Sequence, residues 1–169
     1  LLTLRGTPTL YYGDEIGMKG QKDPYDEGIR RPMEWCSNND CEGMTNWYPV
    51  WNEAPDGISV EEETDDPGSI LSYVRDLISL RNEYPVVETG EIRFISMVDI
   101  ETDEDYKRGI AYLVENEEEG LFMIVNLHRE DVRLRIDQEE LPDFNDSKQL
   151  FGDYSIPVLK DKEFVLNSR

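Results

Sequence analysis

The hydrophobic period of the sequence changes once, near residue 90, and no other feature constrains the fold as strongly. Before the change, residues 69–84 carry apolar side chains at the three- and four-residue spacing of a helix with one buried face. Ser69 is a candidate N-cap, and Pro85 ends the helix. The predicted face of this helix consists of Ile70, Val74, Leu77 and Arg81, with Leu71 and Ile78 beside them.

After Gly90, apolar and polar residues alternate, as they do in strands with one buried face. The alternation predicts strands at residues 92–95, 109–114, 121–127 and 132–136, and weaker strands near 149–151 and 163–166. Short strands at about ten-residue spacing are typical of an antiparallel sandwich or barrel, here over residues 91–169. The side chains expected in its core are Leu113, Phe122, Ile124, Val125 and Leu134.

The first part of the chain is less regular. Residues 1–5 are predicted to be the last turn of a helix that Gly6 stops, and residues 9–12 a short strand that ends at Gly13. Residues 17–66 follow as a loop rich in Gly, Pro, Asn and acidic residues, with tryptophans at positions 35, 47 and 51. Loops of this length are rare in compact domains and are usually functional, so a site is expected here.

The formal net charge of −21 makes nucleic acid and anionic membranes poor partners, because both are negatively charged. The acidic residues occur in runs that lack the alternating ligand spacing of a calcium loop, so we interpret them as solvated faces. No apolar run approaches the roughly 20 residues of a membrane span. No metal and no cofactor is expected. The chain has neither an initiator methionine nor a signal peptide at its start, which indicates a piece of a longer protein.

Two cysteines, Cys36 and Cys41, lie close together in a polar segment. A zinc site needs four Cys or His ligands, and the single histidine, His128, is far away in the sequence. Two interpretations are left: a local disulfide, or two free loop thiols. A disulfide would favour an extracytoplasmic protein.

Four blocks of sequence resemble glycoside hydrolase family 13, the α-amylase and α-glucosidase family. Residues 6–18, GTPTLYYGDEIGM, are similar to the eighth strand of its barrel and the turn that follows. Residues 30–35, RRPMEW, resemble the Arg-x-Pro-Met-x-Trp element, except that Arg31 stands where the family commonly has Thr or a small polar residue. Residues 69–81 resemble the eighth barrel helix, and residues 123–127 a central strand of the C-terminal domain.

This resemblance implies an α+β chain made of two parts. Residues 1–88 would be the last β/α unit of a TIM (β/α)8 barrel, with strand 8, a long active-site loop and helix 8. Residues 89–169 would be the antiparallel β-sandwich that forms the family's C-terminal domain.

The resemblance also implies which chemistry is missing. The family's catalytic Asp, Glu and Asp follow the fourth, fifth and seventh barrel strands, and this chain matches only the later blocks. No catalytic residue is therefore expected, and Asp14 and Glu15 are interpreted as parts of a turn. The parent would be a hydrolase of α-glucosidic bonds in starch-derived glucans or oligosaccharides, and the chain alone would be inactive. Arg30 and Trp35 are the candidate substrate-binding residues of that parent.

A non-catalytic carbohydrate-binding or structural β module is the alternative function. Exposed aromatic residues on the sheet would favour it, whereas the alternation around Phe94, Tyr112 and Phe122 predicts that these rings are buried. The partners expected are an α-glucan or oligosaccharide in the intact enzyme, and either the preceding barrel segment or a second copy of this chain. The four blocks set the family but not the specificity, because endo-amylases, oligo-glucosidases and glucan-isomerising enzymes share them.

Overall fold

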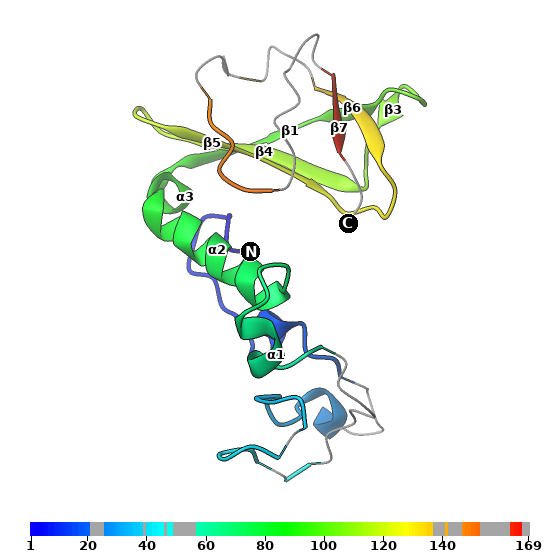
Figure 1. Ribbon diagram of the computed structural model, residues 1–169. Coiled ribbons are helices and arrows are strands. Elements are labelled where there is room, and N and C mark those ends of the chain that lie inside the picture. The colour runs from blue at the N-terminus through cyan, green and yellow to red at the C-terminus, as the bar shows by residue number, and fades with distance from the viewer. Residues whose placement is uncertain are drawn as a thin grey trace. The chain divides into compact units, whose positions relative to one another are not determined.

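The computed structural model describes residues 1–20, 26–38, 40–45, 47–48, 57–136, 141, 147–152 and 163–166. The chain divides into two compact units (Figure 1). Unit 1 contains Leu1–Leu2 and Thr7–Asn82, and unit 2 contains Thr3–Gly6 and Glu83–Arg169. No helix of the described residues is both long and apolar enough to cross a membrane.

Unit 1 is built mostly from loops and short helices. Its elements are the 3-10 helices η1 (Asp14–Ile16) and η2 (Asp26–Ile29) and the α-helices α1 (Val60–Thr64) and α2 (Ile70–Glu83), with Glu83 counted in unit 2. The predicted amphipathic helix is confirmed as α2. Its predicted N-cap is also confirmed, because the Ser69 hydroxyl accepts a hydrogen bond of 3.1 Å from the amide of Ser72.

The buried stripe of α2 differs from the predicted one. Leu71 and Leu80 are buried, whereas Ile70 and Ile78 are 48% and 39% exposed, so the prediction was wrong for these two isoleucines. Val74 and Leu77, the other apolar residues of the predicted face, are half-buried. Arg81 is buried as predicted, and its guanidinium donates a 2.9 Å hydrogen bond to the Leu2 carbonyl, which offsets part of the cost of burying the charge.

The predicted helical turn at residues 1–5 and the predicted strand at residues 9–12 are both wrong. These residues form turns, bends and irregular chain. A strand needs the backbone groups of a neighbouring strand, and no described residue forms a ladder with residues 9–12. Their β-branched and aromatic composition alone does not make them a strand.

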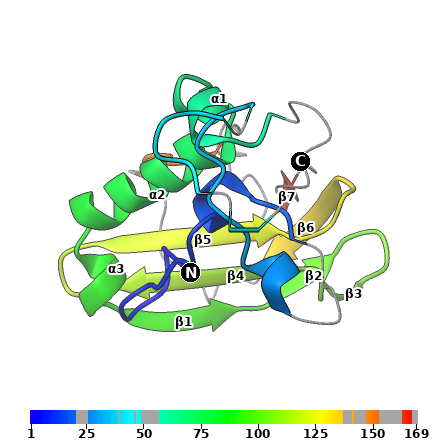
Figure 2. The same cartoon turned by 90° about the horizontal axis from the view of Figure 1, so that it is seen from below.

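Unit 2 begins with the short helix α3 (Val86–Thr89) and continues as two antiparallel sheets. One sheet has the order β1 (Glu91–Ile95), β4 (Gly109–Glu115), β5 (Gly120–Asn126). The other has the order β3 (Glu104–Asp105), β2 (Met97–Asp99), β6 (Val132–Ile136), β7 (Glu163–Leu166). Figure 2 shows β4 lying between β1 and β5. The strong predicted strands and the weak one at 163–166 are confirmed. Residues 147–152 contain no strand, and the side-chain amide of Gln149 donates a hydrogen bond to the Gly152 carbonyl there.

One apolar cluster contains side chains from both sheets: Ile95, Met97, Ala111, Leu113, Leu134 and Ile136. Two predicted core residues are confirmed in it, since Leu113 is 1% and Leu134 0% exposed. Phe122 and Ile124 are half-buried and pack against the cluster. Val125 was wrongly predicted to be buried, because it pairs with Ile110 and, as the next residue after Ile124, points to the opposite face of its sheet.

That opposite face of the three-stranded sheet is covered at one end only. Val86 of α3 packs there with Tyr112 and Val114, and Tyr112 is buried as predicted. α3 is only four residues long, and Ile110 and Val125 on the same face of the sheet are 42% and 43% exposed. Phe94 lies opposite Tyr112 on β1 and is 69% exposed, so the prediction that its ring is buried was wrong.

Candidate functional site

The candidate site of unit 1 begins at a tight turn between residues 11 and 18. Gly13 and Gly17 flank η1 with φ angles of 91° and 64°, which glycine adopts without strain. The Asp14 carboxylate accepts the Tyr11 amide at 3.1 Å, and the Glu15 carboxylate accepts the Gly13 amide at 2.8 Å. Both carboxylates therefore hold the turn that contains them, as the interpretation of Asp14 and Glu15 as turn residues requires.

A buried segment, residues 31–34, crosses the loop, and we call it the strap. Two of its side chains are charged: Arg31 is 4% and Glu34 1% exposed, and their Nη2 and Oε1 atoms are 2.8 Å apart. The same Nη2 donates to the Lys19 carbonyl, and the Tyr12 hydroxyl donates to the Arg31 carbonyl at 2.9 Å. The Arg31 Nε is buried without an acceptor among the described residues. The strap is thus bound to residues 12–19 through Arg31.

The end of the strap is also bound to α1. The carbonyl of Glu34 accepts the Val60 amide at 3.0 Å, and the carbonyl of Trp35 accepts the Glu61 amide at 3.1 Å. The Glu61 carboxylate in turn accepts the Ser37 amide at 3.2 Å. Residues far apart in the sequence are therefore tied together around the strap.

A disulfide joins Cys36 and Cys41 directly after the strap, with Cα atoms 6.2 Å apart. Cys36 is buried, and the described residues include no free cysteine. Of the two interpretations that the sequence left open, the structure has the oxidised pair.

The two predicted substrate-binding residues lie at the two ends of the strap. The side chain of Arg30 is 63% exposed and lies 3.7 Å from the Asp26 carboxylate. Trp35 is 51% exposed. Trp47 is exposed as well, whereas Trp51 lies outside the described residues. The strap therefore separates two solvent-facing side chains, one cationic and one aromatic.

Sequence reasoning missed two other features of this site. Tyr11 and Tyr12 were assigned to a strand, yet their rings are 52% and 40% exposed with centroids 4.6 Å apart. Partial burial raises the pKa of Tyr12. Arg31 was noted only as a departure from the family pattern, and the signal that could have identified its role was an acidic residue, Glu34, three positions later.

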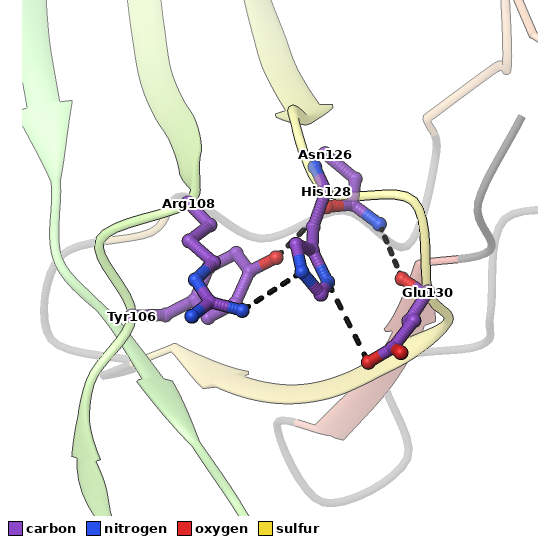
Figure 3. A network of polar contacts seen from close by, with 5 residues as sticks. All are labelled: Tyr106, Arg108, Asn126, His128 and Glu130. Carbon is purple, nitrogen blue, oxygen red and sulfur yellow. Dashed lines mark hydrogen bonds and ion pairs between the residues drawn. The ribbon is translucent and has the colours of Figure 1, made fainter.

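Unit 2 has a polar network at the turn between β5 and β6 (Figure 3). The Asn126 side chain accepts from the Tyr106 hydroxyl at 2.8 Å and from the His128 amide at 2.9 Å, and donates to the Glu130 carbonyl at 3.1 Å. The His128 ring lies between Arg108, 2.8 Å from Nε2, and the Glu130 carboxylate, 3.9 Å from Nδ1. Each of these contacts holds the turn.

A cleft of about 350 Å³ lies near this network, beside the exposed Phe94. Its lining includes the polar residues Ser96, Asp105 and Lys107. Within the part of the chain that the structure describes, no group of three or more His, Cys, Asp or Glu residues could hold a metal ion. Polar groups beside an aromatic side chain are typical of clefts that bind small organic molecules.

Comparison with known proteins identifies the family. Residues 1–90, more than half of the chain, match the model of the family described as alpha amylase, catalytic domain. The chain belongs to the α-amylase family of glycoside hydrolases. It is 35% identical over 129 residues to "Alpha-amylase 3" of Dictyoglomus thermophilum, with 76% of this chain and 24% of that protein covered. It is 33% identical over 134 residues to "4-alpha-glucanotransferase" of Thermotoga maritima, with 78% of this chain and 29% of that protein covered.

Two solved structures are similar to the chain. An α-amylase from H. orenii matches 79% of the chain with a TM-score of 0.65 and 36% identity, over 25% of its own length. The trehalose-6-phosphate hydrolase of Bacillus licheniformis matches 99% of the chain with a TM-score of 0.75; its identity of 24% makes this a likeness of fold alone. The chain thus spans about a quarter to a third of the length of these four proteins.

Proposed function

We propose that this chain is the C-terminal part of a hydrolase that acts on α-glucosidic bonds of starch-derived glucans or oligosaccharides. Residues 1–88 are the end of its (β/α)8 catalytic domain, and residues 89–169 are an antiparallel β-sandwich domain. The observation that carries this proposal is the match to the catalytic-domain family over residues 1–90. It ends close to the boundary between the two units at residues 82–83.

The carboxylates of the described loop support a non-catalytic role for this part. Glycoside hydrolysis requires two carboxyl groups on either side of the scissile bond. Asp14 and Glu15 accept backbone amides of their own turn, and the carboxylate of Glu34 pairs with a buried arginine. We therefore expect the 169-residue chain to release no glucose or maltose from maltooligosaccharides, with the catalytic carboxylates supplied by the remainder of the enzyme.

The contribution of this chain to substrate binding is made by Arg30 and Trp35. An exposed guanidinium presents several fixed donors to sugar hydroxyls, and an indole ring fits the apolar face of a pyranose. A sugar ring has hydroxyls at its edge and C–H groups on its faces. The guanidinium of Arg30 suits the hydroxyls, and the indole of Trp35 suits the C–H face. Together they form one wall of a glucan-binding cleft.

Kinetics of the full-length enzyme on maltooligosaccharides test this role. Arg30→Ala and Trp35→Ala should each raise KM, and the matched control Arg75→Ala, an exposed arginine on α2, should not. Loss of one hydrogen bond to a neutral partner corresponds to roughly 0.5–1.5 kcal/mol, or about 2- to 12-fold in KM. If neither variant differs from Arg75→Ala, Arg30 and Trp35 do not bind substrate.

The exposed apolar side chains of unit 1 imply a covering partner. Leu10, Tyr11, Ile70 and Ile78 are 38–52% exposed. We expect the preceding part of the catalytic domain, or a second copy of this chain, to bury them. Light scattering of the 169-residue chain should therefore detect self-association, whereas a clean monomer with well-protected residues 1–18 would contradict this expectation.

A second candidate function, carbohydrate binding by unit 2, is favoured by Phe94. Its exposed ring lies at a cleft whose lining also offers the Ser96 hydroxyl, the Asp105 carboxylate and the Lys107 ammonium. An aromatic face beside hydrogen-bonding groups suits a neutral sugar. The candidate ligand of this cleft is a short α-glucan.

Native gels cast with soluble starch distinguish the second candidate from the first. Phe94→Ala should lose starch retardation of the 169-residue chain, while the control Leu127→Ala, an equally exposed apolar residue at 66%, keeps it. If wild type and both variants migrate alike with and without starch, unit 2 is not a sugar-binding module. If Phe94→Ala instead changes the oligomeric state, the exposed ring belongs to a protein interface.

A further inference from the structure

We infer that Arg31 and Glu34 are positioning residues that hold Arg30 and Trp35 in place for the substrate. This inference rests on the proposed function, because it concerns the same wall of the glucan cleft. Arg31 and Glu34 are the first and last residues of the strap, so each positioning residue is the sequence neighbour of one substrate-facing residue. A shift of the pair would move both exposed side chains.

The burial of the pair supports a role in position more than one in stability. Arg31 and Glu34 are 4% and 1% exposed, so both charges have lost their contact with water. A buried ion pair is often no more stabilising than two apolar side chains of the same volume, because desolvation offsets the attraction. Unlike apolar packing, the hydrogen bonds of the ion pair form in one geometry only, so they fix the orientation of the two side chains.

The contacts of the pair reach every segment around the strap. The Arg31 guanidinium donates both to the Glu34 carboxylate and to the Lys19 carbonyl, and the Arg31 carbonyl accepts from the Tyr12 hydroxyl. The Glu34 carbonyl accepts from the Val60 amide. The pair therefore fixes the strap against residues 12–19 on one side and against α1 on the other.

Both side-chain hydrogen bonds of Arg31 come from its Nη2 atom, and a lysine would hold its nitrogen less rigidly in this arrangement. A guanidinium has five donors in a planar fork, whereas an ammonium is a compact charge at the end of a flexible stem. A lysine at position 31 would keep the charge opposite Glu34 but would not hold the Lys19 carbonyl in the same fixed plane. Arg31→Lys thus separates the charge of the residue from its geometry.

The test compares thermal stability with kinetics in the full-length enzyme, using Arg31→Met, Arg31→Lys, Glu34→Gln and the double variant Arg31→Met/Glu34→Leu. Arg31→Met and Glu34→Gln each remove one charge of the buried ion pair and should lower Tm and raise KM. Arg31→Lys keeps the charge but not the planar guanidinium and should raise KM. The double variant replaces both charges by apolar groups and should recover most of the wild-type Tm. Its KM for maltooligosaccharides should stay raised by about tenfold, with kcat little changed, since displaced binding groups weaken ground-state and transition-state binding alike.

Two results would overturn the inference. A double variant with wild-type KM would show that the pair only stabilises the loop, and so would Arg31→Lys with both wild-type Tm and wild-type KM. The control Arg75→Met makes the same chemical change on the exposed surface of α2 and should alter neither quantity.

Hydrogen exchange of the 169-residue chain gives a readout that does not depend on sugar. The amides of Val60 and Glu61 donate to the carbonyls of Glu34 and Trp35. If the pair positions the strap, these amides should exchange faster in the double variant than in the wild type. Equal exchange would overturn the inference even if the proposed function holds. Wild-type enzyme without turnover on any α-glucan would instead contradict the proposed function, while faster exchange would still support the positioning of the strap.

Discussion

Replacing Leu134 by alanine tests whether one core holds the two sheets of unit 2 together. Leu134 lies on β6 and is fully buried, and its cluster includes Ala111 and Leu113 from the other sheet. The side chain therefore contributes to both sheets at once. Removing it leaves a cavity between the two sheets.

The expected loss follows from the burial. Leucine to alanine removes roughly three methyl or methylene groups at about 0.8 kcal/mol each, or about 2.4 kcal/mol. The unfilled cavity adds a further amount, and buried leucine-to-alanine changes span about 2–5 kcal/mol. Since Leu134 is fully buried, we expect about 3–4 kcal/mol. The control Leu127→Ala changes a leucine that is 66% exposed and should cost less than about 0.5 kcal/mol.

Hydrogen exchange of the β4 and β5 amides is the suitable assay. All three tryptophans precede residue 83, so tryptophan fluorescence reports on the other unit. The β4 amides are hydrogen-bonded to β1 and β5, and their exchange reports the opening of unit 2 itself. If Leu134→Ala changes this exchange no more than Leu127→Ala does, the two sheets do not share a core.

Two further predictions concern single buried groups. Glu63→Ala should cost about 2–3 kcal/mol in urea unfolding, with Asp65→Ala as an exposed control, because the buried Glu63 carboxylate accepts the amide of Leu71 at the start of α2. Burial raises the pKa of Tyr112, although its hydrogen bond with Thr3 opposes this. The folded state then keeps this proton to higher pH than the unfolded state, so stability is full below pH ~10 and falls as the pH rises through the folded pKa. Tyr112→Phe should lessen this loss of stability at alkaline pH, measured as the urea midpoint at a series of pH values. If the midpoint falls with pH as steeply as in the wild type, Tyr112 is not the cause.

The helix and the strands could be predicted from the sequence because each buries a face at a regular period. The same periods did not predict which residues on a face of the sheet are covered by a neighbouring helix. Phe94 and Tyr112 are cross-strand partners on one face, yet one is exposed and the other buried, because α3 reaches only Tyr112. Neighbouring apolar residues caused the other error, since Ile124 and Val125 are both hydrophobic and only their register with β4 assigns them to opposite faces.

Residues 9–12 show a different limit. Their composition is typical of a strand, but a strand exists only through its partners, and propensity says nothing about whether those partners are present. The turn that follows was predicted correctly because its causes are local. Glycines supply the positive φ angles, and Asp14 and Glu15 bind amides within three residues.

Arg30 and Arg31 show why the sequence pattern of a loop does not predict which of two adjacent arginines is buried. Arg30 and Arg31 carry the same guanidinium, and a loop has no period that assigns one to solvent and the other to the interior. The structure separates them: Arg30 extends into solvent beside Asp26, and Arg31 binds the buried Glu34. If position 31 had the small polar residue common in the family, the Glu34 carboxylate would lose this buried partner, which is strongly unfavourable. Arg31 and Glu34 should therefore change together, and a relative that lacks one should lack the other.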